Sequence, residues 1–293
     1  MNILFYGSCN VTRLIEEDSF KTSILGKALE GHNVNFILCH ETDLSEEQFL
    51  EIIKGQDLII TVPINKEYRN KIYLSTEYIL QNKRKDAKVI IFISLHSNYY
   101  YFDYGHVADG GVHIKEPHYL HFKTLFDFYK QNKTEKQFIE ECVFNKDFKS
   151  YQQLEELASK DIVELFRRQD PLIELQARNE NIIVVDAAKF IKNNYKKHQM
   201  FYSLNHPSNY LLYFIAEEIL KELNLPIALA DRAAIAFDDK FLLYECQQKY
   251  FDFNIYERPV NYAVLCNNNN VTTLEEAVSH FYSSYKEQGI KRY

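Results

Sequence analysis

The chain opens with short apolar runs separated by more polar stretches. Five such runs, each of five to seven residues, predict strands at 2–6, 34–39, 57–62, 88–94 and 181–186. Each run is mostly apolar instead of alternating, so both faces of the strand are expected to be buried, as in a parallel sheet between helices. The pattern therefore predicts an α/β fold with a doubly wound, mostly parallel five-stranded sheet.

The stretches between these runs predict the covering helices, at 10–17, 19–30, 46–55 and about 69–83. Gly31 is expected to close the second of these helices. Ser45 to Gln48 has the form of a capping box that opens the third, and Gly55 closes it. A long irregular segment, residues 98–122, follows the fourth strand and contains four of the ten histidines. Such a segment leaves the carboxyl edge of the sheet, where α/β folds bind ligands.

The second half predicts a helical insertion at about 123–179, in which Pro171 should break the helix. A clean helix is expected over 207–223, with Pro207 at its first position and Pro226 after its end. Residues 1–225 would then form the main domain. Residues 226–293 would form a C-terminal extension or small subdomain, with a helix over 228–253, a strand at 261–266, a turn at 267–270 and a last helix opened by a capping box at 273–276.

Composition narrows the function classes. The net charge of −7 argues against generic nucleic-acid binding. The five cysteines lie far apart without a CxxC pair, which is typical of a reducing compartment and argues against a structural zinc site. No leader and no membrane-spanning run is visible, so we expect a soluble, cytoplasmic protein without a transmembrane segment.

The first strand runs into Gly7-Ser8-Cys9-Asn10, where a tight turn leads into a helix. A thiol at a helix N-terminus is expected to have its thiolate favoured by the helix dipole. His206 lies just before the predicted last helix, so the fold can bring a Cys/His nucleophile–base pair together. The alternative is that Cys9 is a small core residue and His206 a helix cap. Ser8 also offers a hydroxyl, so the nucleophile is one of two neighbouring residues.

Metal binding is the weaker alternative for the irregular segment. His113, His118 and His121 are suitable ligands by residue type, but their spacings match no strong metal motif. We expect no metal, and a polar loop that lines a substrate or cofactor site instead.

The chain resembles the SGNH hydrolases in three short blocks. Gly7-Ser8-Cys9 is similar to their Gly-Asp-Ser block, with Cys9 in the position of the nucleophile. Residues 57–65 resemble their third block, in which a strand ends in Gly-x-Asn and the Asn helps to hold the oxyanion. Asn65 matches that Asn, and Pro63 stands in place of the Gly. Residues 203–206 resemble their Asp-x-x-His block, with Ser203 in place of the acid; Asp186 is a possible substitute.

A closer resemblance, over residues 3 to about 224, is to the WcbI-like family of polysaccharide-biosynthesis enzymes, which are SGNH-like in fold. It rests on four stretches in order: Gly7–Asn10, residues 62–64 with 68–69, the tyrosine-rich loop of Tyr99, Tyr100, Tyr101 and Tyr104, and residues 200–209. Residues 225–293 fall outside it. The resemblance implies coenzyme A or acyl-CoA as a donor and a saccharide or glycan intermediate as the acceptor, in capsule or surface-polysaccharide assembly.

The resemblance also implies roles for single residues. His206 would be the base and Cys9 the nucleophile, with Asn65 and the backbone N–H groups of Cys9 and Asn10 at the oxyanion. The cofactor-binding candidates are Asn10, Arg13 and Arg69, and the substrate-binding candidates are Tyr104, His106, His113 and Asn205. The alternatives are that Asn65 is a turn residue and that both arginines are solvated helix residues.

Three functions follow. The first is an O-acetyltransferase-type acyltransferase that uses coenzyme A. The second is an esterase or deacetylase on the same scaffold, against which the loss of the family Asp at Ser203 counts. The third is a non-catalytic polysaccharide-assembly protein. The sequence leaves open whether the protein forms a homo-oligomer.

Overall fold

The computed structural model describes residues 1–15, 23–229, 240–253 and 262–293. The chain forms two compact units, each assembled from three separate segments. Unit 1 comprises Met1–His96, Ile162–Tyr195 and Asn205–Phe237, and unit 2 comprises Ser97–Asp161, Lys196–Leu204 and Asp238–Tyr293. Residues 123–161 of the predicted helical insertion lie in unit 2 together with the segment from Asp238 to Tyr293, whereas residues 162–179 of that insertion lie in unit 1.

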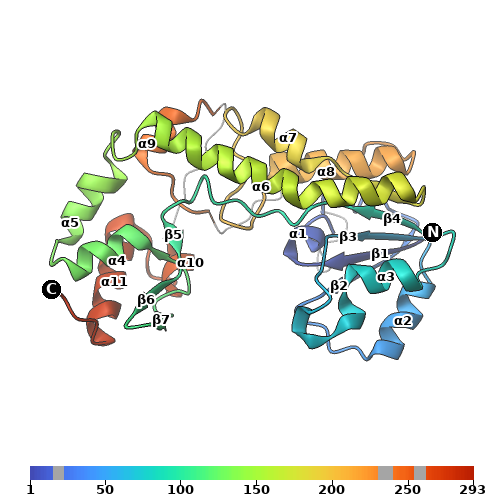
Figure 1. The fold of residues 1–293 in the computed structure, drawn as a ribbon, viewed down its shortest axis with the longest axis horizontal. Helices are drawn as coiled ribbons and strands as arrows, with labels where there is room; N and C mark the ends of the chain where they lie inside the picture. The colour runs from blue at the N-terminus through green and yellow to red at the C-terminus, as the bar shows by residue number, and fades with distance from the viewer. Residues whose placement is uncertain (16–22, 230–239, 254–261) are drawn as a thin grey trace. The chain divides into compact units, whose positions relative to one another are not determined.

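Unit 1 contains the five-stranded parallel sheet that the sequence predicts (Figure 1). Its strands are β1 (Asn2–Gly7), β2 (Asn33–Leu38), β3 (Leu58–Thr61), β4 (Lys88–Ile91) and β9 (Ile182–Val184). They lie in the order β2-β1-β3-β4-β9, which is one of the common orders of doubly wound sheets. Phe5 at the centre of β1 pairs with Phe36 of β2 and Ile60 of β3.

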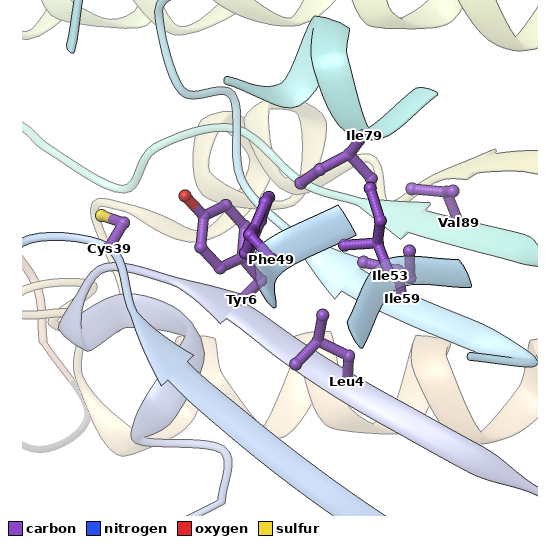
Figure 2. Close-up of a cluster of buried hydrophobic side chains, with 8 residues drawn as sticks. All are labelled: Leu4, Tyr6, Cys39, Phe49, Ile53, Ile59, Ile79 and Val89. Atoms are coloured by element: carbon purple, nitrogen blue, oxygen red, sulfur yellow. The ribbon is translucent and has the colours of Figure 1, made fainter. Parts of the chain in front are cut away.

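Helices α2 (Glu46–Lys54) and α3 (Thr76–Asn82) cover one face of this sheet. Figure 2 shows the side chains packed between them, which are Leu4, Tyr6, Cys39, Phe49, Ile53, Ile59, Ile79 and Val89. The Tyr6 and Phe49 rings lie 4.9 Å apart. The buried Tyr6 hydroxyl donates to the Leu74 carbonyl at 2.7 Å, so its polar atom is satisfied inside the core.

The other face is covered by α7 (Ala187–Asn194), α8 (Asn209–Glu222) and the C-terminal part of α6 (Tyr151–Arg178), as Figure 1 shows. Arg168 of α6 donates to the Ser94 and His96 carbonyls at 2.9 and 3.0 Å. The Gln169 amide donates to the Asp186 carboxylate at 2.6 Å. Helix α6 is therefore fixed to the segments that follow β4 and β9.

These contacts explain why the prediction of a break at Pro171 is wrong: α6 runs through the proline for 28 residues. A proline inside a helix removes one backbone hydrogen bond and crowds the preceding turn. Buried Leu165 and Leu172 on either side of it, with the bonds of Arg168 and Gln169, hold the helix together across that defect.

Two other helix predictions are also wrong in the described residues. Residues 23–31 form turns instead of a helix, and three consecutive residues there, Ser23 to Leu25, are all buried, which no single helix face allows. The region 69–83 holds two short 3₁₀ turns, Tyr68–Asn70 and Ile72–Leu74, before α3 begins. Arg69 and Asn70 have φ angles of 54° and 55°, which a right-handed helix cannot contain.

The first helix is shorter than predicted: α1 spans only Cys9–Thr12, and residues 16–22 of the two predicted helices lie outside the described residues. Both the capping box at Ser45 and the closure of α2 at Gly55 are confirmed. The last helix of unit 1 begins later than predicted, because Ser208 is its N-cap and Pro207 precedes the cap; it ends at Glu222, before Pro226.

Unit 2 is mostly helical (Figure 1). Many of its buried side chains are aromatic, among them Tyr99, Tyr100, Tyr101, Phe122 and Tyr285. Its helices are the N-terminal part of α6, α4 (Lys123–Lys130), α5 (Glu135–Phe138) with a π-helical turn (Ile139–Val143), α9 (Glu245–Tyr250), α10 (Ala263–Cys266) and α11 (Leu274–Glu287). Two small antiparallel pairs, β5 (Tyr104–Gly105) with β8 (His121–Phe122) and β6 (Val107–Asp109) with β7 (Val112–Ile114), form part of the segment predicted to be irregular.

The C-terminal predictions have mixed outcomes. The capping box of Thr273 and Glu276 that opens α11 is confirmed. The strand predicted at 261–266 is wrong where it is described, since Ala263–Cys266 is a helical turn that ends at Asn267 with a φ of 48°. Within the helix predicted over 228–253, α9 is helical and residues 230–239 lie outside the described residues. Among the described helices, none has the length and apolar character needed to cross a membrane.

Gly7, the last residue of β1, allows the sheet and α1 to approach closely. A Cβ atom added there would lie 2.7 Å from Cγ2 of Val11 and 3.1 Å from Cγ2 of Val62. We expect Gly7→Ala to lower the free energy of unfolding by about 1–3 kcal/mol, through overpacking. Urea denaturation tests this, with Gly55→Ala as the matched control, because a Cβ at Gly55 meets nothing closer than 3.5 Å. Equal stability of the two variants would contradict the prediction.

Candidate functional site

The candidate site begins at the carboxyl end of β1, where Ser8 is the N-cap of α1. The Ser8 side chain makes no capping hydrogen bond, while its carbonyl accepts from the Val11 N–H at 2.9 Å. Cys9 is the first residue of α1 and is partly exposed, whereas the other four cysteines are buried. The turn therefore presents Cys9 as the most accessible thiol of the protein.

The buried side chain of Asn10 connects three parts of unit 1. Its Oδ1 accepts from the backbone N–H of Leu95, beyond β4, and its Nδ2 donates to the carbonyl of Asn205, both at 2.9 Å. The same Nδ2 lies 3.8 Å from Sγ of Cys9. One amide thus brings the residue before His206 next to the Cys9 turn. Asn10 was a candidate cofactor ligand, but its side chain serves inside the protein as a clamp.

Several groups act on the Cys9 thiol. The largest effect on its pKa is burial, which raises the pKa above the usual thiol value. The Arg13 guanidinium, the Asn10 side chain and the backbone N–H groups of Asn10 and Cys9 have smaller effects, and each of them lowers the pKa. The net effect is a raised pKa. The N–H groups at the start of α1 therefore favour the thiolate, as the sequence predicts, but burial outweighs them.

This balance predicts the pH dependence of Cys9 reactivity. Alkylation by iodoacetamide should keep rising with pH beyond the usual thiol pKa of about 8.5, since only the thiolate reacts. Arg13→Ala should move the profile to still higher pH, because it removes a charge that stabilises the thiolate. Mass spectrometry of the Cys9 peptide gives the rate at each pH. A profile centred below that usual value would contradict the assignment.

His206 is half-buried and lies two residues before the Ser208 cap, so it is not itself the helix cap. Asp186 was the suggested substitute for the acid that the chain lacks at Ser203, and each of these two residues has a defined place in the structure. Asp186 is the N-cap of α7 and its Oδ1 accepts from Gln169 and from the Lys189 N–H. Ser203 is buried in unit 2.

Asn65 and Arg69 follow β3 in an exposed turn. Oδ1 of Asn65 accepts from the Glu67 N–H at 3.0 Å, so its side chain stabilises the turn, as the simpler alternative predicts. The Arg69 guanidinium donates to the carbonyls of Cys39, His40 and Thr42, which uses much of its hydrogen-bonding capacity. Arg13 ends α1 and is exposed, and its charge acts on Cys9.

The remaining candidates lie in unit 2. Tyr104 is buried against Phe122 and Phe241, so its ring is part of the core. His106 and His113 are exposed, with ring centroids 6.1 Å apart. His121 is buried between the Tyr285 hydroxyl and the Ile114 carbonyl, and burial lowers its pKa to about 4. Among the described residues, no group of three His, Cys, Asp or Glu side chains is arranged to hold a metal ion.

Comparison with known proteins supports the resemblance seen in the sequence. The family model for the polysaccharide biosynthesis enzyme WcbI matches residues 22–227. This match leaves out Gly7–Asn10. No curated protein matches the chain.

A solved structure has the same fold, with a TM-score of 0.68 and 18% identity, over 98% of this chain and 90% of that one. It is described as WcbI, a novel polysaccharide biosynthesis enzyme, in its native form without a disulfide bond between coenzyme A and one of its cysteines. This coverage includes most of residues 225–293, so the shared fold extends beyond the stretch over which the sequence resemblance runs. Because the family model matches more than half of the chain, the chain belongs to the WcbI family of polysaccharide biosynthesis enzymes.

Proposed function

We propose that this protein transfers an acyl group from coenzyme A to a saccharide, in surface or capsular polysaccharide synthesis, with Cys9 and His206 at its catalytic site. The observation that carries the proposal is the Asn10 clamp, which donates to the Asn205 carbonyl and approaches the Cys9 sulfur with the same nitrogen. This contact supports Cys9 as the nucleophile and His206 as the base, since it joins the two stretches of sequence that contain them.

Coenzyme A is the donor to test first. The description of the WcbI structure refers to coenzyme A and a cysteine, and membership of that family makes the same ligand a reasonable choice here. Arg13 is the cation nearest to this chemistry in sequence and acts electrostatically on Cys9. We assign Arg13 to a phosphate of the donor, and leave Arg69 as a weaker candidate because backbone carbonyls already bind its guanidinium.

In the proposed reaction, His206 removes the proton from the Cys9 thiol as its sulfur attacks the thioester carbonyl carbon. The backbone N–H groups of Cys9 and Asn10 stabilise the oxyanion, and the C–S bond to coenzyme A then breaks. Coenzyme A leaves as a thiol after taking up the proton from His206. A saccharide hydroxyl next attacks the acyl-enzyme, gives its proton to His206, and releases Cys9 as the thiol. The raised pKa of Cys9 makes such a base necessary near neutral pH.

The scaffold proposed for this chemistry is SGNH-like. The sheet order, the nucleophile after β1 and the histidine before the last helix of unit 1 support that assignment. All five cysteines are free thiols, which supports a cytoplasmic location.

Calorimetric titration with coenzyme A tests the donor. We expect saturable binding that Arg13→Ala weakens and that Arg167→Ala leaves unchanged, since the exposed Arg167 is paired with Glu164 on α6. Incubation with acetyl-CoA should then add one acetyl group at Cys9, seen as a mass increase that Cys9→Ala abolishes. Absence of binding at millimolar coenzyme A would remove the donor and favour the esterase alternative, which hydrolyses a model ester without coenzyme A.

A further inference from the structure

Unit 2 contains a pocket of about 250 Å³ between the start of α6 and helix α9, two elements that Figure 1 shows close together. Residues just before α6 and in its first turn form one wall, and α9 forms the other. The lining residues are Lys146, Asp147, Lys149, Ser150, Tyr151, Leu154, Cys246, Lys249 and Tyr250. None of these residues is a candidate for the acyl-transfer chemistry.

The pocket is positively charged although the whole protein has a net charge of −7. It is lined by three lysines and a single carboxylate, Asp147, which pairs with Lys249 at 3.0 Å. Within the described part of the chain, neither Lys146 nor Lys149 has a carboxylate partner. The Lys149 ammonium lies over the rings of Phe102 and Phe148, which hold it at the pocket. Two ammonium groups that pair with no carboxylate of the described residues, in one concave site, favour an anion.

An aromatic pair joins the two walls of the pocket, with Tyr151 from α6 and Tyr250 from α9. The Tyr151 and Tyr250 rings have centroids 4.8 Å apart, and Tyr151 is 63% exposed although it is a large hydrophobic residue. Lys196 helps to fix this pair, because its ammonium donates to the Tyr151 hydroxyl. The ammonium is itself held by a bond to the Glu155 carboxylate at 2.6 Å. The exposed tyrosine is thus a fixed flat surface, of the kind on which sugar rings and bases stack.

Tyr151 also borders a second hollow, an open groove of about 600 Å³ along α6. The groove is lined by polar side chains of the same helix, which are Gln152, Glu155, Glu156, Ser159 and Lys160. Carboxylates, an amide and a hydroxyl are the groups that hydrogen-bond to the hydroxyls of a sugar. A cationic pocket and a groove bordered by polar side chains therefore meet at one exposed ring.

We propose that these two hollows bind a phosphorylated saccharide, with its phosphate at Lys146 and Lys149 and its sugar ring on Tyr151, extending into the groove. The pocket is smaller than the roughly 300–1,000 Å³ of sites that enclose drug-sized ligands, so it suits a phosphate with part of a ring. This inference rests on the proposed function and specifies its acceptor as a sugar that carries phosphate.

Titration with glucose 1-phosphate, followed by calorimetry, tests the site, with glucose and inorganic phosphate as separate probes. We expect glucose 1-phosphate to bind more tightly than either probe alone. The double variant Lys146→Gln/Lys149→Gln should weaken it at least tenfold, and Tyr151→Ala should weaken it while leaving the affinity for phosphate unchanged. Lys136→Gln is the matched control, since Lys136 is an exposed lysine of the same unit that pairs with Glu140.

Lys149→Met is a second variant that retains packing on the two phenylalanines, so weaker binding cannot be attributed to a lost fold. Equal affinity for glucose 1-phosphate in the double variant and in the Lys136 control would overturn the proposal. The same titrations with coenzyme A separate the two proposals. Coenzyme A binding that is lost in the lysine variant, with no glucose 1-phosphate binding, would assign the pocket to the donor and overturn only the acceptor site.

Discussion

His206→Ala should slow the transfer of an acetyl group from acetyl-CoA to Cys9 by about 10²–10⁴-fold, the usual contribution of a general base. The reason is the raised pKa of Cys9, which leaves little thiolate near neutral pH unless a base removes the proton. Single-turnover reactions stopped at fixed times, with the acetylated fraction read from intact mass, give the rate directly.

Two controls separate a base from a structural role. His40→Ala changes an exposed histidine of the same unit, paired with Glu41, and should leave the rate unchanged. Added imidazole should restore part of the rate of His206→Ala, because a small base can enter the space that the side chain leaves. A wild-type rate in His206→Ala would exclude this residue as the base, and a slow rate that imidazole does not restore would indicate a positioning role.

Asn10→Ala should destabilise the protein and the site together. The substitution leaves the buried Leu95 N–H and the Asn205 carbonyl without their partner, so we expect the free energy of unfolding to fall by about 2–4 kcal/mol. The pKa of Cys9 should rise further, because a donor to its thiolate is lost. Urea denaturation measures the first effect and the pH profile of alkylation the second.

Asn10→Asp refines the test, because it retains an acceptor for Leu95 and loses the donor to Asn205 and Cys9. Its alkylation profile should also move to higher pH, since a carboxylate beside the sulfur disfavours the thiolate. Asn82→Ala serves as the control, because Asn82 bonds to its own helix at the Tyr78 carbonyl. If Asn10→Ala lowers stability no more than Asn82→Ala, the clamp has no special role.

Much of the sheet could be predicted from the sequence, because buried parallel strands are continuous apolar runs and each was found within a few residues. The errors arose where tertiary contacts override local preference. Pro171 stays within α6 because Arg168 and Gln169 bond to neighbouring segments, which no local pattern reveals. Arg69 is a good helix former by residue type, yet its φ angle is left-handed. Its guanidinium bonds to three carbonyls of residues 39–42, and these contacts with a distant part of the sequence are not visible in a local pattern.

The sequence indicates which residues to test as a site, but it does not report their burial or their hydrogen-bond partners. The proximity of the Cys9 turn to the His206 segment follows from the carboxyl ends of parallel strands lying at one edge. The role of Asn10 was not predictable in detail, because it depends on Leu95 and Asn205, which are distant in sequence. An asparagine directly after Cys9 was the local signal in the sequence. The pKa of Cys9 depends on burial, which the sequence does not report for a single residue.

The order of segments in the two units has a consequence for how the protein can be divided. The chain passes from one unit to the other after His96, Asp161, Tyr195, Leu204 and Phe237. A protease cut at any one of these passages leaves four covalent connections in place, so a single nick cannot release either unit. For the same reason no single truncation isolates the sheet domain: a stop codon after residue 225 would remove all of the third segment of unit 2 and leave its other two without the helices that they pack against.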